Sequence, residues 1–322
     1  MNKDIKYYGI DISKDVFDVC DSNGLSACYQ NNPKGFKKFK KSLSENAHCV
    51  MEATGYYHYQ LAYFLLESSI KVSVENPLSV KRFIQMKLSK VKTDKSDAKM
   101  ICRYAEQVEL RLWEGQSKNQ IESLQISRLL DLYFKQRTAL KNKIHGEKVL
   151  GNPSAIVLKS LKQSKRALDK QIKELEDRLT EIVRSEHQDL LTRLESIPGM
   201  GRKTSMMLIV LTDGFKRFET AQQLCSYSGL TPTIRQSGSS VRGRSRISKV
   251  GNKKLRNLLF MCSFTACKHN KACKLMYDRI VAKGKSKKLA LIAICNKLLK
   301  QAFAIAKSGL MYDETYKGMK PV

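Results

Sequence analysis

The first 75 residues contain five short apolar segments with the length and composition of β-strands, at positions 7–11, 16–21, 25–30, 48–53 and 71–75. Asn23-Gly24, between the second and third segments, is typical of a two-residue hairpin turn. Segments of helical length lie at 35–44, 58–68, 78–87 and 96–107. Strands joined by a hairpin and followed by strand–helix units predict a mixed sheet flanked by helices.

Residues 116–195 have a different hydrophobic period. Apolar side chains recur every three or four positions, beginning with Ile126, Leu130 and Tyr133, and the pattern returns after residue 165 with Leu168 and Ile172. Between these stretches the chain is broken by Gly-Asn-Pro at 151–153. The pattern predicts two long helices that form an antiparallel hairpin or coiled coil. We expect this hairpin to act as a spacer or an oligomerisation arm.

From residue 196 the chain is expected to be compact and mostly helical, with helices near 251–269, 271–282 and 287–307. The length of 322 residues is also more than one ordinary domain needs. We therefore predict three parts: an α/β domain at 1–112, the helical hairpin at 113–195 and a helical C-terminal domain at 196–322.

The charge balance favours a polyanionic partner. The sequence contains 59 Lys and Arg against 30 Asp and Glu, which gives a formal net charge of +29. Such an excess produces a positive field that attracts nucleic acid. A membrane role is disfavoured, because the most apolar window, 289–305, contains Lys297 and Lys300. The start of the chain has no feature of a signal peptide, so a cytoplasmic, nucleoid-associated protein is expected.

The nine cysteines contain no C-x-x-C pair, and their number is odd. Both features favour reduced thiols that pack in the core. Cys262, Cys267, Cys273 and His269 lie close together in sequence, but their spacing fits no zinc motif.

Four acidic residues in the first part suggest a metal site. Asp11 and Glu52 each end a predicted strand, and Asp94 and Asp97 lie three residues apart at the predicted start of a helix. That spacing places both carboxylates on one helix face. Alone, Asp94 would be interpreted as a helix cap and Asp97 as a first-turn acid. Together, the four acids provide the hard oxygen ligands that Mg²⁺ or Mn²⁺ prefers, and two such ions can promote phosphodiester cleavage.

Two segments of the C-terminal part are suited to DNA. SIPGMGRKTSMML, at 196–208, predicts helix, turn and helix, where the backbone at Gly199 and Gly201 could approach a phosphate beside Arg202 and Lys203. A tight structural turn is the alternative. Residues 228–256 combine small residues with many cations, namely Arg235, Arg242, Arg244, Arg246, Lys249, Lys253, Lys254 and Arg256.

The stretches GIDISKDVFDV, VMEATG and KTDKSDAKMI, together with YSGLTP and ISKVGNKKLRNLL, resemble the Asp-Glu-Asp-Asp transposases of the insertion-sequence-110 type. The resemblance implies a RuvC-like N-terminal domain of the RNase H fold, with Asp11, Glu52, Asp94 and Asp97 as metal ligands. It also implies a serine nucleophile, which best matches Ser237, while Ser239 and Ser240 stay open. Members of this family are implicated in recombination guided by an element-encoded bridge RNA.

The expected function is therefore a DNA transposase or site-specific recombinase that cleaves and rejoins strands with a serine and Mg²⁺ or Mn²⁺. Its expected partners are donor and target DNA, a guide RNA and further copies of the chain in a dimer or tetramer. Two alternatives remain: a Holliday-junction nuclease that uses the same acids with water as nucleophile, and a non-enzymatic nucleic-acid scaffold.

Overall fold

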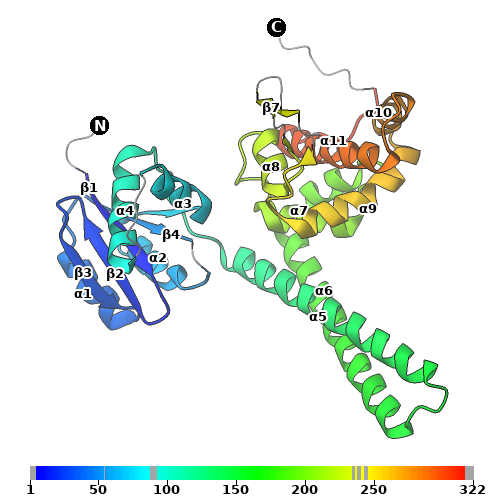
Figure 1. Cartoon of the computed structure of the whole chain (residues 1–322), viewed down its shortest axis with the longest axis horizontal. Coiled ribbons are helices and arrows are strands. Elements are labelled where there is room, and N and C mark those ends of the chain that lie inside the picture. Colours follow the sequence, from blue (N-terminus) through cyan, green and yellow to red (C-terminus); the bar gives the residue numbers. More distant parts are fainter. Residues whose placement is uncertain are drawn as a thin grey trace. The chain divides into compact units, whose positions relative to one another are not determined.

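The computed structural model describes residues 5–53, 55–87, 93–233, 236–237, 241–242 and 246–315. The chain divides into two compact units, Met1–Gln116 and Ser117–Val322 (Figure 1). The second unit contains both the long helices and the helices that follow them. The division into three parts therefore stays a prediction.

The first unit is built on a five-stranded mixed sheet with strand order β3-β2-β1-β4-β5. The strands are β1 (Lys6–Ile12), β2 (Val16–Asp21), β3 (Ser26–Gln30), β4 (Ala47–Glu52) and β5 (Lys71–Glu75). The first three strands pair antiparallel, and β4 and β5 run parallel to β1. The mixed sheet predicted from the apolar segments is confirmed.

Four helices cover this sheet: α1 (Pro33–Ser42), α2 (His58–Glu67), α3 (Pro77–Met86) and α4 (Asp94–Gln107). One core contains Phe39 of α1 and Leu61 of α2 with Ile10 of the sheet. A smaller cluster packs Val50 of β4 against Ile101 of α4. The two faces of the sheet are thus covered by different helices, as the alternation of side chains along a strand requires.

Gly9 allows α4 to lie directly on β1. A Cβ atom at this position would lie 2.2 Å from the backbone nitrogen of Cys102 and 2.3 Å from the carbonyl oxygen of Ala98. No other residue type fits there without moving the helix, because both of these atoms belong to the backbone. The position of α4 on the sheet therefore depends on the missing side chain of Gly9.

The second unit begins with the two predicted long helices, α5 (Lys118–Val149) and α6 (Ala155–Glu195). They pack side by side, and their connection lies far from the helices that follow (Figure 1). The connection includes Gly151, whose φ is +83°, in the break expected from the sequence. The backbone of α6 departs from helical geometry at His187.

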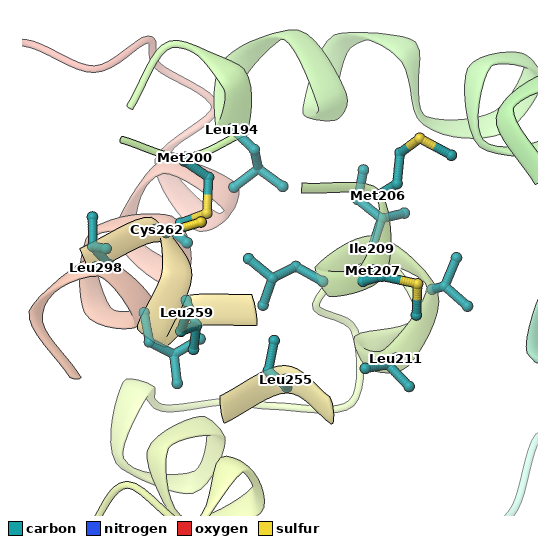
Figure 2. Packing of buried hydrophobic residues seen from close by; sticks show 14 of the residues in the cluster. Leu194, Met200, Met206, Met207, Ile209, Leu211, Leu255, Leu259, Cys262 and Leu298 are labelled. Atoms are coloured by element: carbon teal, nitrogen blue, oxygen red, sulfur yellow. The ribbon is translucent and has the colours of Figure 1, made fainter. Parts of the chain in front are cut away.

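The remaining helices are α7 (Arg202–Thr212), α8 (Ala221–Ser228), α9 (Lys253–His269), α10 (Lys271–Ala282) and α11 (Lys287–Ser308). Every residue of α7 from Thr204 to Thr212 is buried, so this helix lies at the centre of the unit. Figure 2 shows Met207 and Ile209 of α7 packing with Leu255 and Leu259 of α9. Thus α7 and α9 contribute to the centre of the core of the helical body, which is formed by α7–α11.

The described residues between α8 and α9 contain four two-residue strands: β6 (Pro232–Thr233), β7 (Gln236–Ser237), β8 (Val241–Arg242) and β9 (Arg246–Ile247). They pair antiparallel as β6 with β9 and β7 with β8. The described part of the basic segment therefore contains two short antiparallel strand pairs.

By length and composition alone, α11 could cross a membrane, and it is the single helix of that kind within the described ranges. However, Ile294, Leu298 and Ala302 on one of its faces belong to the core of the second unit. The buried face is that of a core helix.

All nine cysteines are free. Cys262 and Cys273 are buried in the core of the second unit, which agrees with the packing role predicted for them.

Candidate metal centre and nucleic-acid interface

Carboxyl groups form a row across four neighbouring strands. Asp11 of β1 is the direct partner of Asp18 in the antiparallel β1–β2 pair. The parallel β1–β4 register ends one residue before Asp11 and Glu52, and Glu52 in turn is paired with Glu75 of β5. Four acids on adjacent strands therefore share one line across the sheet.

These acids face the side of the sheet that α4 covers. Ile10, Phe17 and Met51 belong to the core on the α1–α2 side. Successive side chains of a strand point to opposite faces. The next residues, Asp11, Asp18 and Glu52, therefore point toward the α4 side.

Helix α4 supplies the other two predicted acids from its first turn. Thr93 forms a capping box with Ser96, which fixes the start of the helix at Asp94. Asp94 is exposed and Asp97 is half-buried. Because Gly9 lets α4 lie against β1, this turn comes close to the end of that strand.

The four predicted acids act on one another electrostatically. The pKa of Asp11 is raised to about 6, first by burial and then by the charges of Asp97, Asp94, Glu52 and Asp18. Each of these neighbours opposes the ionised form of Asp11. The charges of Glu52, Asp94 and Asp97 therefore reach Asp11, and this end of the sheet has an excess of negative charge.

The cluster fits a divalent cation by donor chemistry and charge. Its groups are carboxylate oxygens, which suit Mg²⁺ or Mn²⁺, and a cation would relieve the repulsion that raises the pKa of Asp11. Within the described ranges, no three His, Cys, Asp or Glu side chains are arranged to hold a metal ion. The assignment of ligands therefore rests on charge and placement and stays a prediction.

The predicted nucleophile, Ser237, ends β7, where its backbone pairs with Val241 of β8. Arg242 pairs in the same way with Gln236. The alternative serines, Ser239 and Ser240, lie outside the described residues, and so do the predicted phosphate contacts Arg235 and Arg244.

The two glycines of the predicted phosphate-binding turn have different roles. Gly199 has a φ of +96°, and a Cβ there would lie 2.6 Å from the backbone nitrogen of Ala266. It is therefore required for packing against α9. Gly201 has open space where a Cβ would be, and it caps α7 without a side-chain hydrogen bond. Arg202 and Lys203 are exposed at this helix end, so an anion could approach it.

Three of the predicted cationic contacts have partners within the protein. The ammonium group of Lys254 lies 2.7 Å from a carboxylate oxygen of Asp131 and donates to the carbonyl oxygen of Ser127 at 3.1 Å. Arg256 donates to the carbonyl oxygen of Ser228 at 2.8 Å, while Lys203 lies 3.4 Å from Glu176. Lys254 and Arg256 thus connect elements of the fold. The exposed cations that remain in the described part of the basic segment are Arg246, Lys249 and Lys253.

Known proteins resemble the chain over both units. A family profile of DEDD transposases of the IS110 type matches residues 8–150, and the profile of the transposase IS116/IS110/IS902 family matches residues 191–278. The pilin gene-inverting protein of Moraxella bovis is 30% identical over 96% of this chain and 98% of its own length.

The chain belongs to the IS110 family of transposases.

Other members are similar over a comparable extent. The Moraxella lacunata pilin gene-inverting protein is 31% identical over 96% of this chain and 98% of its own. The transposase for insertion sequence element IS1111A of Coxiella burnetii is 26% identical over 98% of this chain and 92% of its own length. Membership of the IS110 family makes the chain a DNA transposase or recombinase, so the alternative of a non-enzymatic scaffold is wrong.

Two members of the row of carboxyl groups in this IS110 transposase were not predicted from the sequence. They are Asp18 and Glu75. Asp18 is 8% exposed and acts on the charge of Asp11. Its position between Phe17 and Val19, inside an otherwise apolar strand, was the available signal. Glu75 accepts a hydrogen bond from the Tyr104 hydroxyl at 3.1 Å, and burial raises its pKa.

Proposed function

We propose that this IS110 transposase cleaves and rejoins DNA with Ser237 as the nucleophile and with divalent metal held by Asp11, Glu52, Asp94 and Asp97. The observation that supports it best is the environment of Asp11, whose pKa is raised first by burial and then by the charges of four surrounding carboxylates. Such a cluster is costly without a cation. The proposal includes a RuvC-like RNase H fold for the first unit, with which the mixed sheet is consistent.

The proposed reaction transfers a DNA strand to the protein and back. The serine hydroxyl gives up its proton as its oxygen forms a bond to phosphorus, the bond between phosphorus and the departing sugar oxygen breaks, and that oxygen takes up a proton. Mg²⁺ or Mn²⁺, when bound, would activate the nucleophile and stabilise the leaving oxygen. The four carboxylates hold and orient the ions, while the cations near Ser237 bind the phosphates on either side.

The serine and the acids belong to different units. The reaction therefore needs the first unit of the same chain, or of another copy, to approach the serine segment. We propose a dimer or tetramer, because recombination joins two duplexes. A relative bears the name of a pilin gene-inverting protein, and inversion of a DNA segment likewise requires cutting and rejoining.

We further propose that a bridge RNA guides the enzyme to donor and target DNA. The net charge of +29 is compatible with an RNA partner, because RNA is also a polyanion. Sequencing of the RNA that co-purifies with the protein from its native host tests this part. Enrichment of one transcript from beside the gene is expected, and an unselective RNA population would argue against a guide.

A covalent protein–DNA adduct tests the nucleophile. Wild-type protein, labelled DNA and Mg²⁺ are expected to give a band that survives denaturing electrophoresis. Ser237→Ala is expected to abolish the band while DNA binding is kept, because the change removes a single oxygen. Ser239→Ala and Ser240→Ala are the matched controls.

If one of these controls loses the adduct instead, the nucleophile is that serine. Efficient cleavage by wild-type protein without any adduct would identify water as the nucleophile and favour the nuclease alternative.

A further inference from the structure

The helical hairpin changes its charge along its length. Residues 135–173, which include its connection, contain eleven Lys and Arg and two acids. The parts of the hairpin nearer the helical body, 117–134 and 174–195, contain five Lys and Arg and nine acids. A general excess of basic residues would not produce this reversal. The cations are therefore concentrated on the part of the hairpin that lies away from α7–α11 (Figure 1).

Five of these cations form a line along one face of α6. Their spacing of three and four residues places them on one side of a helix, over a rise of about 21 Å. The buried residues Leu168 and Ile172 lie on the opposite side and face α5. We call this line the arm stripe; it comprises Lys159, Lys162, Arg166, Lys170 and Lys173.

The arm stripe is exposed and largely without ion pairs. All five side chains are exposed. Within the described ranges, the stripe forms one ion pair, in which the Lys170 ammonium lies 3.8 Å from a carboxylate oxygen of Glu174. Both of these side chains are mostly exposed. Exposed pairs of this kind contribute little to stability. The charges of the arm stripe therefore contribute little to the stability of the fold.

The distal arm also has little core of its own. In α5 the last buried residue is Leu130, and in α6 the first is Leu168. The helices between these positions are held together by partly buried side chains such as Leu140. This part of the hairpin is suited to presenting a surface rather than to stabilising the body.

We propose that the arm stripe binds the phosphate backbone of duplex DNA outside the strands that are cleaved. This inference rests on the DNA-binding function of the family and not on the proposed metal or nucleophile. A recombinase must hold duplex on either side of the reacting phosphate, and a straight line of cations can lie along a duplex and reach the phosphates that border a groove. At about 3.4 Å per base pair, 21 Å corresponds to roughly six base pairs.

Salt dependence gives the expected size of the contribution. Neutralisation of five phosphates adds about −4.5 to the slope of log K against log salt concentration. That slope corresponds to a loss of about 500-fold in affinity between about 50 and 200 mM salt. The stripe would thus provide a measurable part of the total binding.

The test compares the full-length wild-type chain with a variant in which all five stripe residues are changed to Gln. Gln keeps helix propensity and removes the charge. The matched control changes Lys34, Lys37, Lys38, Lys40 and Lys41 to Gln; these are five exposed lysines of α1 with the same total charge. The probe is a 30-base-pair DNA duplex of arbitrary sequence in EDTA, where binding does not depend on metal or cleavage.

The stripe variant is expected to have a slope reduced by about 4 to 5, whereas the α1 control changes it by less than 1. An unchanged slope in the stripe variant, or equal reductions in both variants, would overturn the proposal. A 30-base-pair RNA hairpin serves as the second probe, and a loss confined to RNA would overturn the assignment to DNA. If circular dichroism shows lost helix in the five-residue variant, K162Q/R166Q is measured instead, with an expected reduction of about 2.

Discussion

Asp11 and Asp18 are direct cross-strand partners in the antiparallel pair of β1 and β2. Like charges at such positions destabilise a sheet. Asp18 is almost fully buried, and the pKa of Asp11 is raised by burial and by four neighbouring carboxylates. The sheet therefore has a local excess of negative charge that a cation or a proton would relieve. This relation leads to the first two predictions.

Asp11→Asn is expected to stabilise the metal-free protein. The folded-state pKa of Asp11, about 6, lies above its ordinary value of 3.8. The destabilising effect of its ionisation therefore grows as pH rises from about 3.8 and is fully present above about 6. At pH 7.5 in EDTA, the free energy of unfolding should increase by about 1–3 kcal/mol. Urea unfolding checks this value.

With Mg²⁺ present, wild-type protein should become more stable than Asp11→Asn. Wild-type protein is expected to gain thermal stability with increasing Mg²⁺, because only the folded state holds the ion, while Asp11→Asn should gain little. A variant that is less stable than wild type in EDTA, and that shows the same Mg²⁺ response, would contradict the metal site.

Asp18→Asn is expected to weaken the binding of metal without abolishing the reaction. Asp18 adds negative charge beside Asp11 but is not one of the four proposed ligands. Loss of such an outer group typically costs 10–100-fold in metal affinity. The Mg²⁺ concentration for half-maximal cleavage should therefore rise at least about tenfold, while the rate at saturation stays close to wild type. Cleavage that no Mg²⁺ concentration restores would make Asp18 a direct ligand.

Gly9→Ala should displace α4 and impair the site it supplies. The added Cβ would meet backbone atoms of Ala98 and Cys102. Overpacking of this kind typically costs about 1–3 kcal/mol. The stabilisation by Mg²⁺ should also decrease, because Asp94 and Asp97 move with the helix.

Gly146→Ala is the matched control for this change. Gly146 lies within α5, and nothing lies within 4 Å of its added Cβ. Ala should therefore stabilise the helix by about 0.5–1 kcal/mol. If Gly9→Ala kept both its stability and its Mg²⁺ response, the close contact of α4 with β1 would not matter for the site.

Protonation of His48 should destabilise the first unit in acid. Its pKa is lowered to about 4 by burial and by the charge of Lys71. Its Nε2 lies 2.8 Å from the Ser73 hydroxyl, and the ring packs near Tyr7. Because the folded-state pKa lies below the ordinary value of 6.5, the stability is fully present above about 6.5 and is lost as pH falls through 4.

Between pH 7.5 and 4.5 this single group should account for about 2–3 kcal/mol. The measurement is urea unfolding of wild type and His48→Asn at both pH values. The variant should lose less stability over this range than wild type. Equal losses would assign the acid sensitivity to other groups.

The sequence predicted elements well wherever an apolar run with clear ends was present. The bounds expected for the second and fifth strands, 16–21 and 71–75, agree with β2 and β5. In contrast, α8 has only Leu224, Cys225 and Ser228 buried over eight residues, too few to show a period. The two-residue strands near Ser237 are shorter than any periodic signal.

Within the site, the sequence identified acids at element ends but not relations across the sheet. The opposition of Asp18 to Asp11 follows from strand register, which distant packing decides. Likewise, Lys254 was predicted as a phosphate contact, but it donates to Ser127, which lies 127 positions away in the chain. The partners of a charged side chain are set by the fold, so its accessibility to DNA could not be predicted from sequence.

The division into two units has a consequence for synthesis on the ribosome. The acids lie within the first 116 residues, and Ser237 follows about 120 residues later, which corresponds to roughly 6–24 s at typical elongation rates. The first unit is a continuous stretch with its own core, so it can fold while the rest is still being made. A nascent or prematurely terminated chain would thus present the carboxylates without the serine. In the proposed chemistry, such a fragment would keep the metal ligands but could not attach itself to the chromosome through Ser237.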